Sequence, residues 1–216
     1  MEKKLPSSTK VVVIGGGVVG CSVAYHLAKF GWKDTILLER DQLTSGTTWH
    51  AAGLVSQLGP TAAVTKIRKY TLDLYKELEK KVDHSAGLRL NGALSIAQHN
   101  GRWQELQRQA TTAQLYDVDV RILDKNQIKK DYPIINTDEV IGGILMPGDG
   151  AADPSGVTHM LAKAARMEGA QIFEKSPVEE ILTKDGKISG VKVKGQKIQC
   201  EYLSLIHISE PTRPFH

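Results

Sequence analysis

The sequence predicts a three-layer α/β fold: a parallel sheet covered by helices, followed by the start of an inserted antiparallel sheet. The first observation is a β-branched run, a glycine-rich turn and an apolar helix in direct succession over residues 10–30. The second is another short apolar strand at residues 35–39. The third is a series of short β-prone runs with glycine turns after residue 170. A β-α-β unit that leads into mixed α and β elements produces this order.

The first half of the chain divides into elements at its turn residues. Residues 10–14 are predicted as a buried parallel strand, and residues 18–30 as a helix that Gly31 closes in the left-handed conformation. Residues 41–60 are rich in Gly, Ser and Thr, which favours a functional loop. Residues 61–82 carry apolar side chains at helical spacing and are predicted as a surface helix with one buried face.

The second half alternates helices with short strands. Residues 88–97 are expected to form a strand pair, or one bent strand, around Asn91-Gly92. Asp124 is expected to cap a short helix, and Pro154 to open a helix that runs to about Glu168. A further helix is predicted at 102–115, and strands at 120–123, 140–146, 171–173, 178–183, 188–193 and 197–201.

Composition excludes several classes of protein. The chain has 216 residues and a net charge of +4, with lysines and arginines scattered rather than gathered in a stripe, which argues against nucleic-acid binding. Cys21 and Cys200 are far apart, so neither a disulfide framework nor a zinc site is expected. Residues 11–28 are mostly apolar, but four glycines and a histidine interrupt them, which favours strand, turn and helix over a membrane span.

The turn Gly15-Gly16-Gly17-Val18-Val19-Gly20 has the spacing of a dinucleotide-binding motif. Gly15 permits the sharp turn, Gly17 lets the backbone approach a pyrophosphate, and Gly20 lets the helix lie close to the sheet. Because Glu39 ends the next strand about 20 residues later, its carboxylate is placed to accept ribose hydroxyls. The pattern predicts a Rossmann-like nucleotide unit rather than a glycine-rich turn of another α/β protein. An acid at this position disfavours NADP but does not separate FAD from NAD.

Several further segments resemble one family. Glu39-Arg40 and the stretch from Thr44 to Leu54, which reads TSGTTWHAAGL, resemble the D-amino-acid-oxidase-like FAD-dependent oxidoreductases, and more closely the sarcosine and dimethylglycine dehydrogenases. The resemblance covers residues 11–202. It continues through the segments LNGAL at 90–94, PGDG at 147–150 and Asp153-Pro154.

The resemblance implies an FAD site. In this family the loop after the second strand wraps the pyrophosphate, and the histidine of the Trp-His pair is bonded to the flavin 8α-methyl carbon, which assigns that role to His50. The alternative is an ordinary loop histidine that bonds to the backbone. Trp49 is expected to pack against the cofactor domain, Asp153 to cap a helix, and Cys21 to pack in the core. The cofactor-binding residues implied are Gly15, Gly17, Gly20, Glu39, Arg40, Ser45, Gly46, Thr47, His50, Gly53 and Leu54.

The resemblance also implies an activity, namely oxidative N-demethylation of sarcosine or dimethylglycine. Electrons would pass to an electron-transfer flavoprotein, and tetrahydrofolate would bind elsewhere in the full-length protein. Eukaryotic relatives lie in the mitochondrial matrix and bacterial ones in the cytoplasm, although no transit peptide is evident. A second interpretation is a non-catalytic regulatory subunit of pyruvate dehydrogenase phosphatase, which is similar over the same region but lacks the Trp-His pair. An NAD-dependent dehydrogenase is disfavoured by the loop 44–53.

Both ends of the chain depart from the family pattern. Residues 1–10 are polar and expected to be disordered. Residues 203–216 resemble the translation of a sequencing adaptor, so we expect a non-native tail that makes few contacts; a divergent native terminus is the alternative. We therefore expect a truncated domain over 11–202 that holds FAD weakly and is inactive alone. No catalytic residue is assigned within it, and no metal site is expected.

Overall fold

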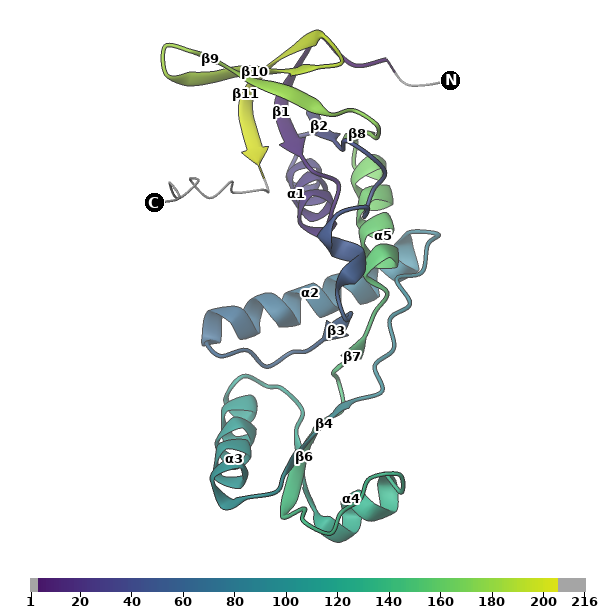
Figure 1. Cartoon of the computed structure of the whole chain (residues 1–216), viewed down its shortest axis with the longest axis vertical. Helices are drawn as coiled ribbons and strands as arrows, with labels where there is room; N and C mark the ends of the chain where they lie inside the picture. Colours follow the sequence, from purple (N-terminus) through teal and green to yellow (C-terminus); the bar gives the residue numbers. More distant parts are fainter. Residues whose placement is uncertain (1–3, 206–216) are drawn as a thin grey trace, which may run out of the picture. The chain divides into compact units, whose positions relative to one another are not determined.

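The computed structural model describes residues 4–205 and divides into two compact units (Figure 1). The first unit contains residues 4–52, 78–86 and 154–205, and the second contains residues 53–77 and 87–153. The predicted α/β class is confirmed, because the first unit is built on a mainly parallel sheet and the second on an antiparallel one.

The sheet of the first unit has six strands in the order β8-β2-β1-β11-β10-β9. Strands β8, β2, β1 and β11 run parallel to one another, whereas β10 pairs antiparallel with both β11 and β9. The predicted parallel pair is confirmed, since Val11–Ile14 lie beside Thr35–Leu38. The strands are β1 (Ser8–Ile14), β2 (Thr35–Leu38), β8 (Gln171–Phe173), β9 (Val178–Lys184), β10 (Lys187–Val193) and β11 (Gln196–Leu205).

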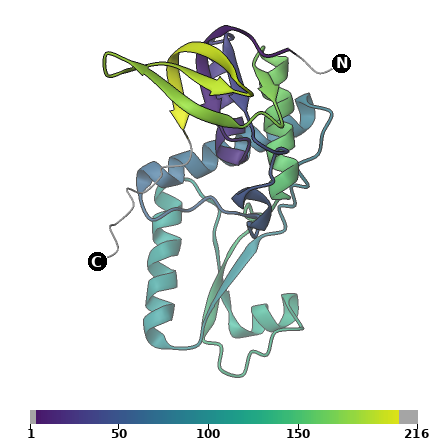
Figure 2. The same ribbon diagram turned by 45° about the horizontal axis from the view of Figure 1, so that its top comes forward.

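Both faces of the parallel strands are covered, which explains their continuous apolar character. Helices α1 (Val18–Lys29) and α5 (Pro154–Met167) pack against each other, and the small buried residues Cys21, Ala24 and Ala28 permit close approach. On the other face, Val12, Ile36 and Leu38 share a core cluster with apolar residues of β10 and β11. In Figure 2 the yellow-green strands β9 to β11 lie in front of the purple strand β1 and helix α1.

The second unit contains a three-stranded antiparallel sheet in the order β4-β6-β5, formed by Ala93–Ala97, Gly142–Met146 and Arg121–Asp124. Its two faces carry different cores, because Ile144 packs with helix α3 (Asn100–Leu115) and Leu145 packs toward helix α4 (Lys125–Asp131). The predicted cap is confirmed, since Asp124 and Gln127 form a reciprocal capping box at α4. The other elements are β3 (Leu54–Val55), which pairs with β7 (Gly150–Ala151), and most of α2 (Ala62–Lys81).

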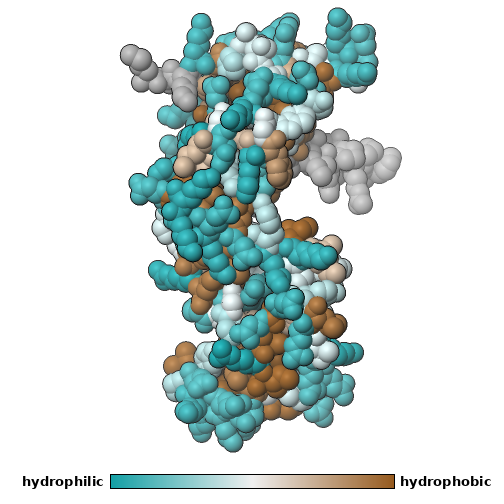
Figure 3. Space-filling model, turned by 180° about the vertical axis from the view of Figure 1, so that it is seen from behind, coloured by the Kyte–Doolittle hydropathy of each residue, from teal (hydrophilic) through white to brown (hydrophobic). Residues whose placement is uncertain are grey.

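The second unit also exposes large apolar side chains. Leu115, Ile122 and Ile134 are all exposed, and Figure 3 shows apolar patches on this unit among hydrophilic side chains. Among residues 4–205, no helix combines the length and apolar character that a membrane crossing requires.

Three expectations are wrong. Residues 88–97 form no strand pair of their own: only Ala93–Ala97 is a strand, and it pairs with β6, because the chain at Gly92 bonds to Asp149 instead of turning back. Residues 8–10, expected to be disordered, belong to β1, where the Thr9 hydroxyl and the Lys10 amide both donate to the Asp34 carboxylate.

The third correction concerns the expected tail. Residues 203–205 continue β11 and pair with Val12, Val13 and Ile14. Strand pairing uses backbone groups that every residue other than proline carries, so the loss of family-like side chains after Tyr202 does not end the strand. The remainder of the expected tail, 206–216, lies outside the described residues.

Candidate cofactor-binding site

A pocket of about 440 Å³ opens in the first unit where β1 and β2 end. It lies between the glycine turn that leads into α1 and the loop that follows β2. Its lining contains six of the predicted site residues together with five residues that sequence reasoning did not assign to the site. The lining residues are Gly15, Gly16, Gly17, Val18, Val19, Glu39, Arg40, Gly46, Thr47, Thr48 and Ala51.

The glycine turn is shaped by close approach. Gly15 has φ +108°, a conformation that side-chain-bearing residues rarely adopt, and its amide donates to the carbonyl of Leu38. A Cβ on Gly16 would lie 2.6 Å from Leu43 Cδ2, and a Cβ on Gly17 would lie 2.8 Å from Thr48 Oγ1. The turn therefore packs too closely against Leu43 and Thr48 to hold side chains at Gly16 and Gly17, and its backbone lines the pocket directly.

Glu39 joins the end of β2 to this turn. Its Oε2 accepts a hydrogen bond of 2.6 Å from the Gly16 amide, and its Oε1 accepts one of 2.9 Å from the Asp41 amide. A carboxylate oxygen has two acceptor positions, so each oxygen retains one for a hydroxyl in the pocket. The backbone of Glu39 is held by Phe173 and Ser176, through bonds of 2.9 and 2.7 Å. The acid is thus fixed at the pocket wall.

The N-terminus of α1 faces the same pocket. The Val18 amide donates to Thr48 Oγ1 at 3.1 Å, whereas the amides of Gly17 and Val19 have no protein acceptor among residues 4–205. Free amides at a helix N-terminus, together with the helix dipole, favour bound anions. The site can therefore hold a phosphate group without a basic side chain.

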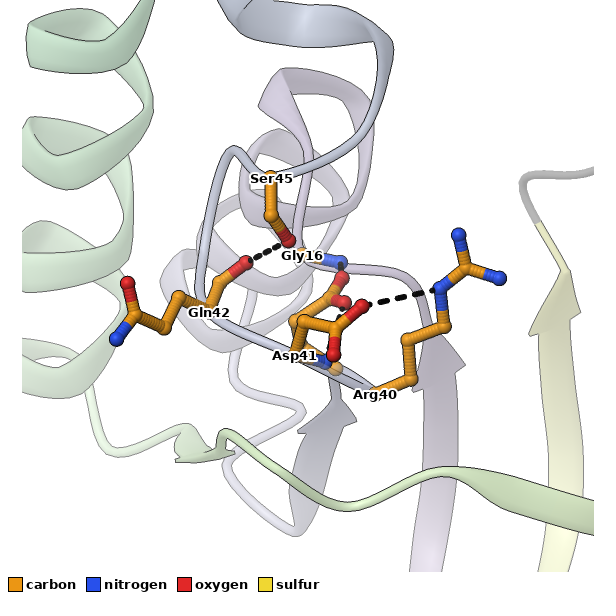
Figure 4. Close-up of polar contacts among 6 residues, drawn as sticks. Gly16, Arg40, Asp41, Gln42 and Ser45 are labelled. Atoms are coloured by element: carbon orange, nitrogen blue, oxygen red, sulfur yellow. Dashed lines mark hydrogen bonds and ion pairs between the residues drawn. The ribbon is translucent and has the colours of Figure 1, made fainter.

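The loop after β2 folds back onto the turn. Thr44 has φ +72° and its amide donates to the Gly16 carbonyl. The Ser45 hydroxyl donates to the Gln42 carbonyl at 2.7 Å, so it satisfies its own loop and does not line the pocket (Figure 4). Arg40 lines the pocket, and its Nε lies 3.4 Å from Asp41 Oδ2 in an exposed pair (Figure 4).

His50 lies on a 3-10 turn, Thr47–His50, whose first two residues line the pocket. Its exposed ring is stacked on Trp49, with ring centroids 3.7 Å apart. Trp49 is expected to pack against the domain, but it is 58% exposed, and its ring lies against that of the exposed His50. Gly53 and Leu54 belong to the second unit, where Gly53 has φ +72° and accepts a bond from the Ala152 amide.

Cys21 lies beneath the turn, and its thiol is unreactive because it is buried. Burial raises the pKa of its thiol to about 12, and the sulfur lies 3.8 Å from the Gly16 carbonyl oxygen. The expected packing role is confirmed. Within residues 4–205, no group of three or more His, Cys, Asp or Glu side chains is arranged to hold a metal ion.

Thr48 is the most informative residue that sequence reasoning missed. The run Thr44-Ser45-Gly46-Thr47-Thr48 indicated a hydroxyl-rich loop, but only the fold shows which hydroxyl reaches helix α1. Gly16, Val18, Val19 and Ala51 were also unassigned, because their contribution to the pocket depends on backbone position.

A family model described as FAD dependent oxidoreductase matches residues 10–206. The chain is 39% identical to human mitochondrial sarcosine dehydrogenase over 204 residues, which are 92% of this chain and 22% of that protein. It is 36% identical to human mitochondrial dimethylglycine dehydrogenase, with 83% of this chain and 21% of that protein covered. It is also 32% identical to the mouse mitochondrial pyruvate dehydrogenase phosphatase regulatory subunit, over 92% of this chain and 23% of that protein.

A solved structure agrees with the fold. The crystal structure of L-proline dehydrogenase from P. horikoshii superposes with a TM-score of 0.85 at 26% identity, and the match covers 93% of this chain and 53% of that chain. The chain spans about a fifth of the length of the curated relatives it matches.

Proposed function

The chain belongs to the FAD-dependent oxidoreductase family, and on that premise we propose that its full-length protein oxidises the N-methyl group of sarcosine or dimethylglycine. The observation that carries the proposal is the 3-10 turn Thr47–His50, which holds the Trp-His pair beside residues that line the pocket. Sarcosine is favoured because the loop 44–48 resembles that of sarcosine dehydrogenases, and because human sarcosine dehydrogenase is 39% identical to the chain.

Each part of the pocket suits one part of FAD. The glycine turn and the free amides of Gly17 and Val19 would hold the pyrophosphate, and Glu39 would accept the ribose hydroxyls. Gly46 and Thr47 would line the pyrophosphate from the opposite loop, with Arg40 at the rim. Gly20 would keep α1 close to the sheet. The Ser45 hydroxyl would stabilise the loop through its hydrogen bond to the Gln42 carbonyl. Gly53 and Leu54 would be the last cofactor-binding residues of the stretch that resembles the family.

When bound, FAD supplies two-electron acceptor chemistry. A methylated amine that loses a hydride from its N-methyl carbon becomes an iminium. Hydrolysis of the iminium releases formaldehyde and the demethylated amine, and transfer of the same carbon to tetrahydrofolate gives methylene-tetrahydrofolate instead. In this proposal the residues of the pocket bind and orient the cofactor. We assign none of them to binding of the amine.

His50 is proposed to hold the flavin covalently. The attachment would form one N–C bond between an imidazole nitrogen and the 8α-methyl carbon, in place of the imidazole N–H bond and one methyl C–H bond. It would release two electrons and two protons, for which dioxygen would be the terminal oxidant, giving hydrogen peroxide. A neutral imidazole is a competent nucleophile for this reaction. The tether would keep the cofactor in place during repeated turnover.

The names of the relatives support a location. We propose that the protein of a eukaryote lies in the mitochondrial matrix, since the matched sarcosine and dimethylglycine dehydrogenases are named as mitochondrial. The electron acceptor that we propose, an electron-transfer flavoprotein, rests on the family resemblance of the sequence alone. A bacterial source would place the protein in the cytoplasm.

A non-catalytic regulatory subunit is the second candidate, because the mouse phosphatase regulatory subunit is 32% identical over nearly the same residues. The Trp49-His50 pair favours the enzyme. Amine oxidation and flavin attachment separate the two candidates.

The test is made on the full-length protein. It is denatured in acid and separated by gel electrophoresis, and flavin fluorescence should remain with the polypeptide. His50→Ala should release this fluorescence while FAD still binds, and His159→Ala, which removes another exposed histidine of the first unit, should not. Sarcosine or dimethylglycine should yield formaldehyde in the presence of an electron acceptor. Tightly bound FAD without oxidation of either amine would support the regulatory interpretation.

A further inference from the structure

Trp49 is the least expected side chain of the pocket loop. Its indole is 58% exposed, although burial of a tryptophan is strongly favourable. Its ring lies 3.7 Å from that of His50, centroid to centroid, with an angle of 35° between the ring planes. Successive side chains of a 3-10 turn point roughly 120° apart, so neighbours do not stack by default. The stacked arrangement is therefore a specific choice of side-chain rotamers.

The backbone beneath this pair is fixed at both sides. Thr48 Oγ1 accepts a hydrogen bond from the Val18 amide at 3.1 Å, which ties the turn to helix α1. The Ala51 amide donates to the Thr48 carbonyl at 3.1 Å, which closes the turn after His50. The backbone of Trp49 and His50 is thus held in place by the residues on either side. The orientation of the imidazole still depends on its own side-chain torsions.

We infer that Trp49 is a positioning residue for His50, whose indole face holds the imidazole in one orientation for attachment to the flavin. This inference rests on the proposed attachment of FAD at His50. Orienting a nucleophile before it reacts lowers the barrier to bond formation. The rotational freedom of its side chain is already lost when the protein folds, so the reaction does not have to restrict it. The exposure of Trp49 excludes a role as a core anchor, so its substitution should affect attachment more than folding.

The test compares Trp49→Leu with Trp49→Phe in the full-length protein. Apoprotein is mixed with FAD, and two quantities are followed: the FAD bound in total and the FAD that survives acid denaturation. Trp49→Leu should bind the wild-type amount of FAD but attach it about tenfold more slowly, which is the scale of one aromatic pair. Trp49→Phe keeps an aromatic face and should restore most of the rate. Both variants should melt at the wild-type temperature.

A second measurement reports the stack without the flavin. With histidine labelled at its Cε1 carbon, the His50 resonance of the apoprotein should carry an upfield ring-current shift in the wild type and in Trp49→Phe, and lose it in Trp49→Leu. Equal attachment rates in wild type and Trp49→Leu would overturn the inference, as would a Trp49→Phe rate as slow as that of Trp49→Leu. An absence of covalent flavin in the wild type would instead overturn the proposed attachment itself, and the loss of the ring-current shift would then still report whether Trp49 orients His50.

Discussion

The carboxylate of Glu39 accepts a 2.6 Å hydrogen bond from the backbone amide of Gly16, which joins the end of β2 to the glycine turn after β1. The same carboxylate accepts from the Asp41 amide. One acid therefore organises the turn and the start of the following loop, and it also lines the pocket. A substitution at Glu39 should therefore test cofactor binding, and one at Gly16 should test the stability of the fold.

Glu39→Gln should weaken FAD binding. The amide group of glutamine would point a donor at the Gly16 or the Asp41 amide, and the charged acceptor for the ribose would be lost. Hydrogen bonds to charged groups contribute about 1.5–3 kcal/mol, so FAD affinity should fall on the order of ten- to a hundredfold. The measurement is quenching of FAD fluorescence in a His50→Ala background, where the flavin exchanges freely. Glu105→Gln, an exposed change on α3, is the control and should leave affinity unchanged.

Gly16→Ala should destabilise the fold. The new methyl carbon would lie 2.6 Å from Leu43 Cδ2 and 2.9 Å from Glu39 Cβ, and Leu43 is buried. Overpacking of this kind costs about 1–3 kcal/mol, measured as a lower free energy of unfolding in urea. Gly46→Ala is the matched control, because a Cβ there meets nothing within 4 Å. An equal loss in both variants would show that the clash is not the cause.

The β-α-β unit could be predicted because its signals are local. The β-branched strand, the glycines and the acid at residue 39 each fix backbone geometry within a few residues, and the structure places Gly15, Gly17 and Glu39 around one pocket. The contact between Thr48 and Val18 spans 30 residues, so no local pattern reveals which hydroxyl of the loop caps the helix. The direction of the Ser45 hydroxyl escaped prediction for the same reason.

Asn91-Gly92 shows a different limit. The pair is typical of a tight hairpin, and Gly92 does adopt φ +86°. The expected partner strand does not form, since Arg89 bridges to Ala151 and β4 pairs with β6. A turn motif fixes the local backbone, but the partner of each strand is chosen by the packing of residues more than 40 positions away.

Asp149 should make stability depend on pH. Burial raises the pKa of this carboxyl above its ordinary value of 3.8, against the Gln57 amide, the Gln57 side chain and the Arg68 charge, which lower it. The folded state then binds the proton more tightly than the unfolded state, so the contribution of Asp149 is most favourable below pH 3.8 and is lost as pH rises through the higher folded pKa. The free energy of unfolding of Asp149→Asn, taken relative to that of the wild type, should therefore be higher at pH 7 than at pH 4. Urea denaturation of both proteins at the two pH values measures this difference, and a lower value at pH 7 would contradict the prediction.

Cys21 should resist thiol reagents in the native protein. Its pKa is raised to about 12 by burial, so very little thiolate exists at neutral pH and no reagent reaches it. Cys200 is also buried, and burial raises the pKa of its thiol. Peptide mapping after maleimide treatment should find both cysteines unmodified until urea is added. Ser45→Cys, at an exposed position, is the positive control and should react in the native state.

Thr48→Val should loosen the start of helix α1. Valine has nearly the shape of threonine but cannot accept the hydrogen bond from the Val18 amide, which lies 3.1 Å from Thr48 Oγ1. Loss of a capping acceptor costs about 1 kcal/mol, so the free energy of unfolding should fall by that amount. Thr48→Ser keeps the hydroxyl and should retain most of the stability. Thr111→Val removes a hydroxyl that only bonds back to the preceding turn of α3, and it serves as the control for β-branched substitution. If Thr48→Val and Thr48→Ser lose the same stability, the methyl group of Thr48 rather than its hydroxyl supports the helix.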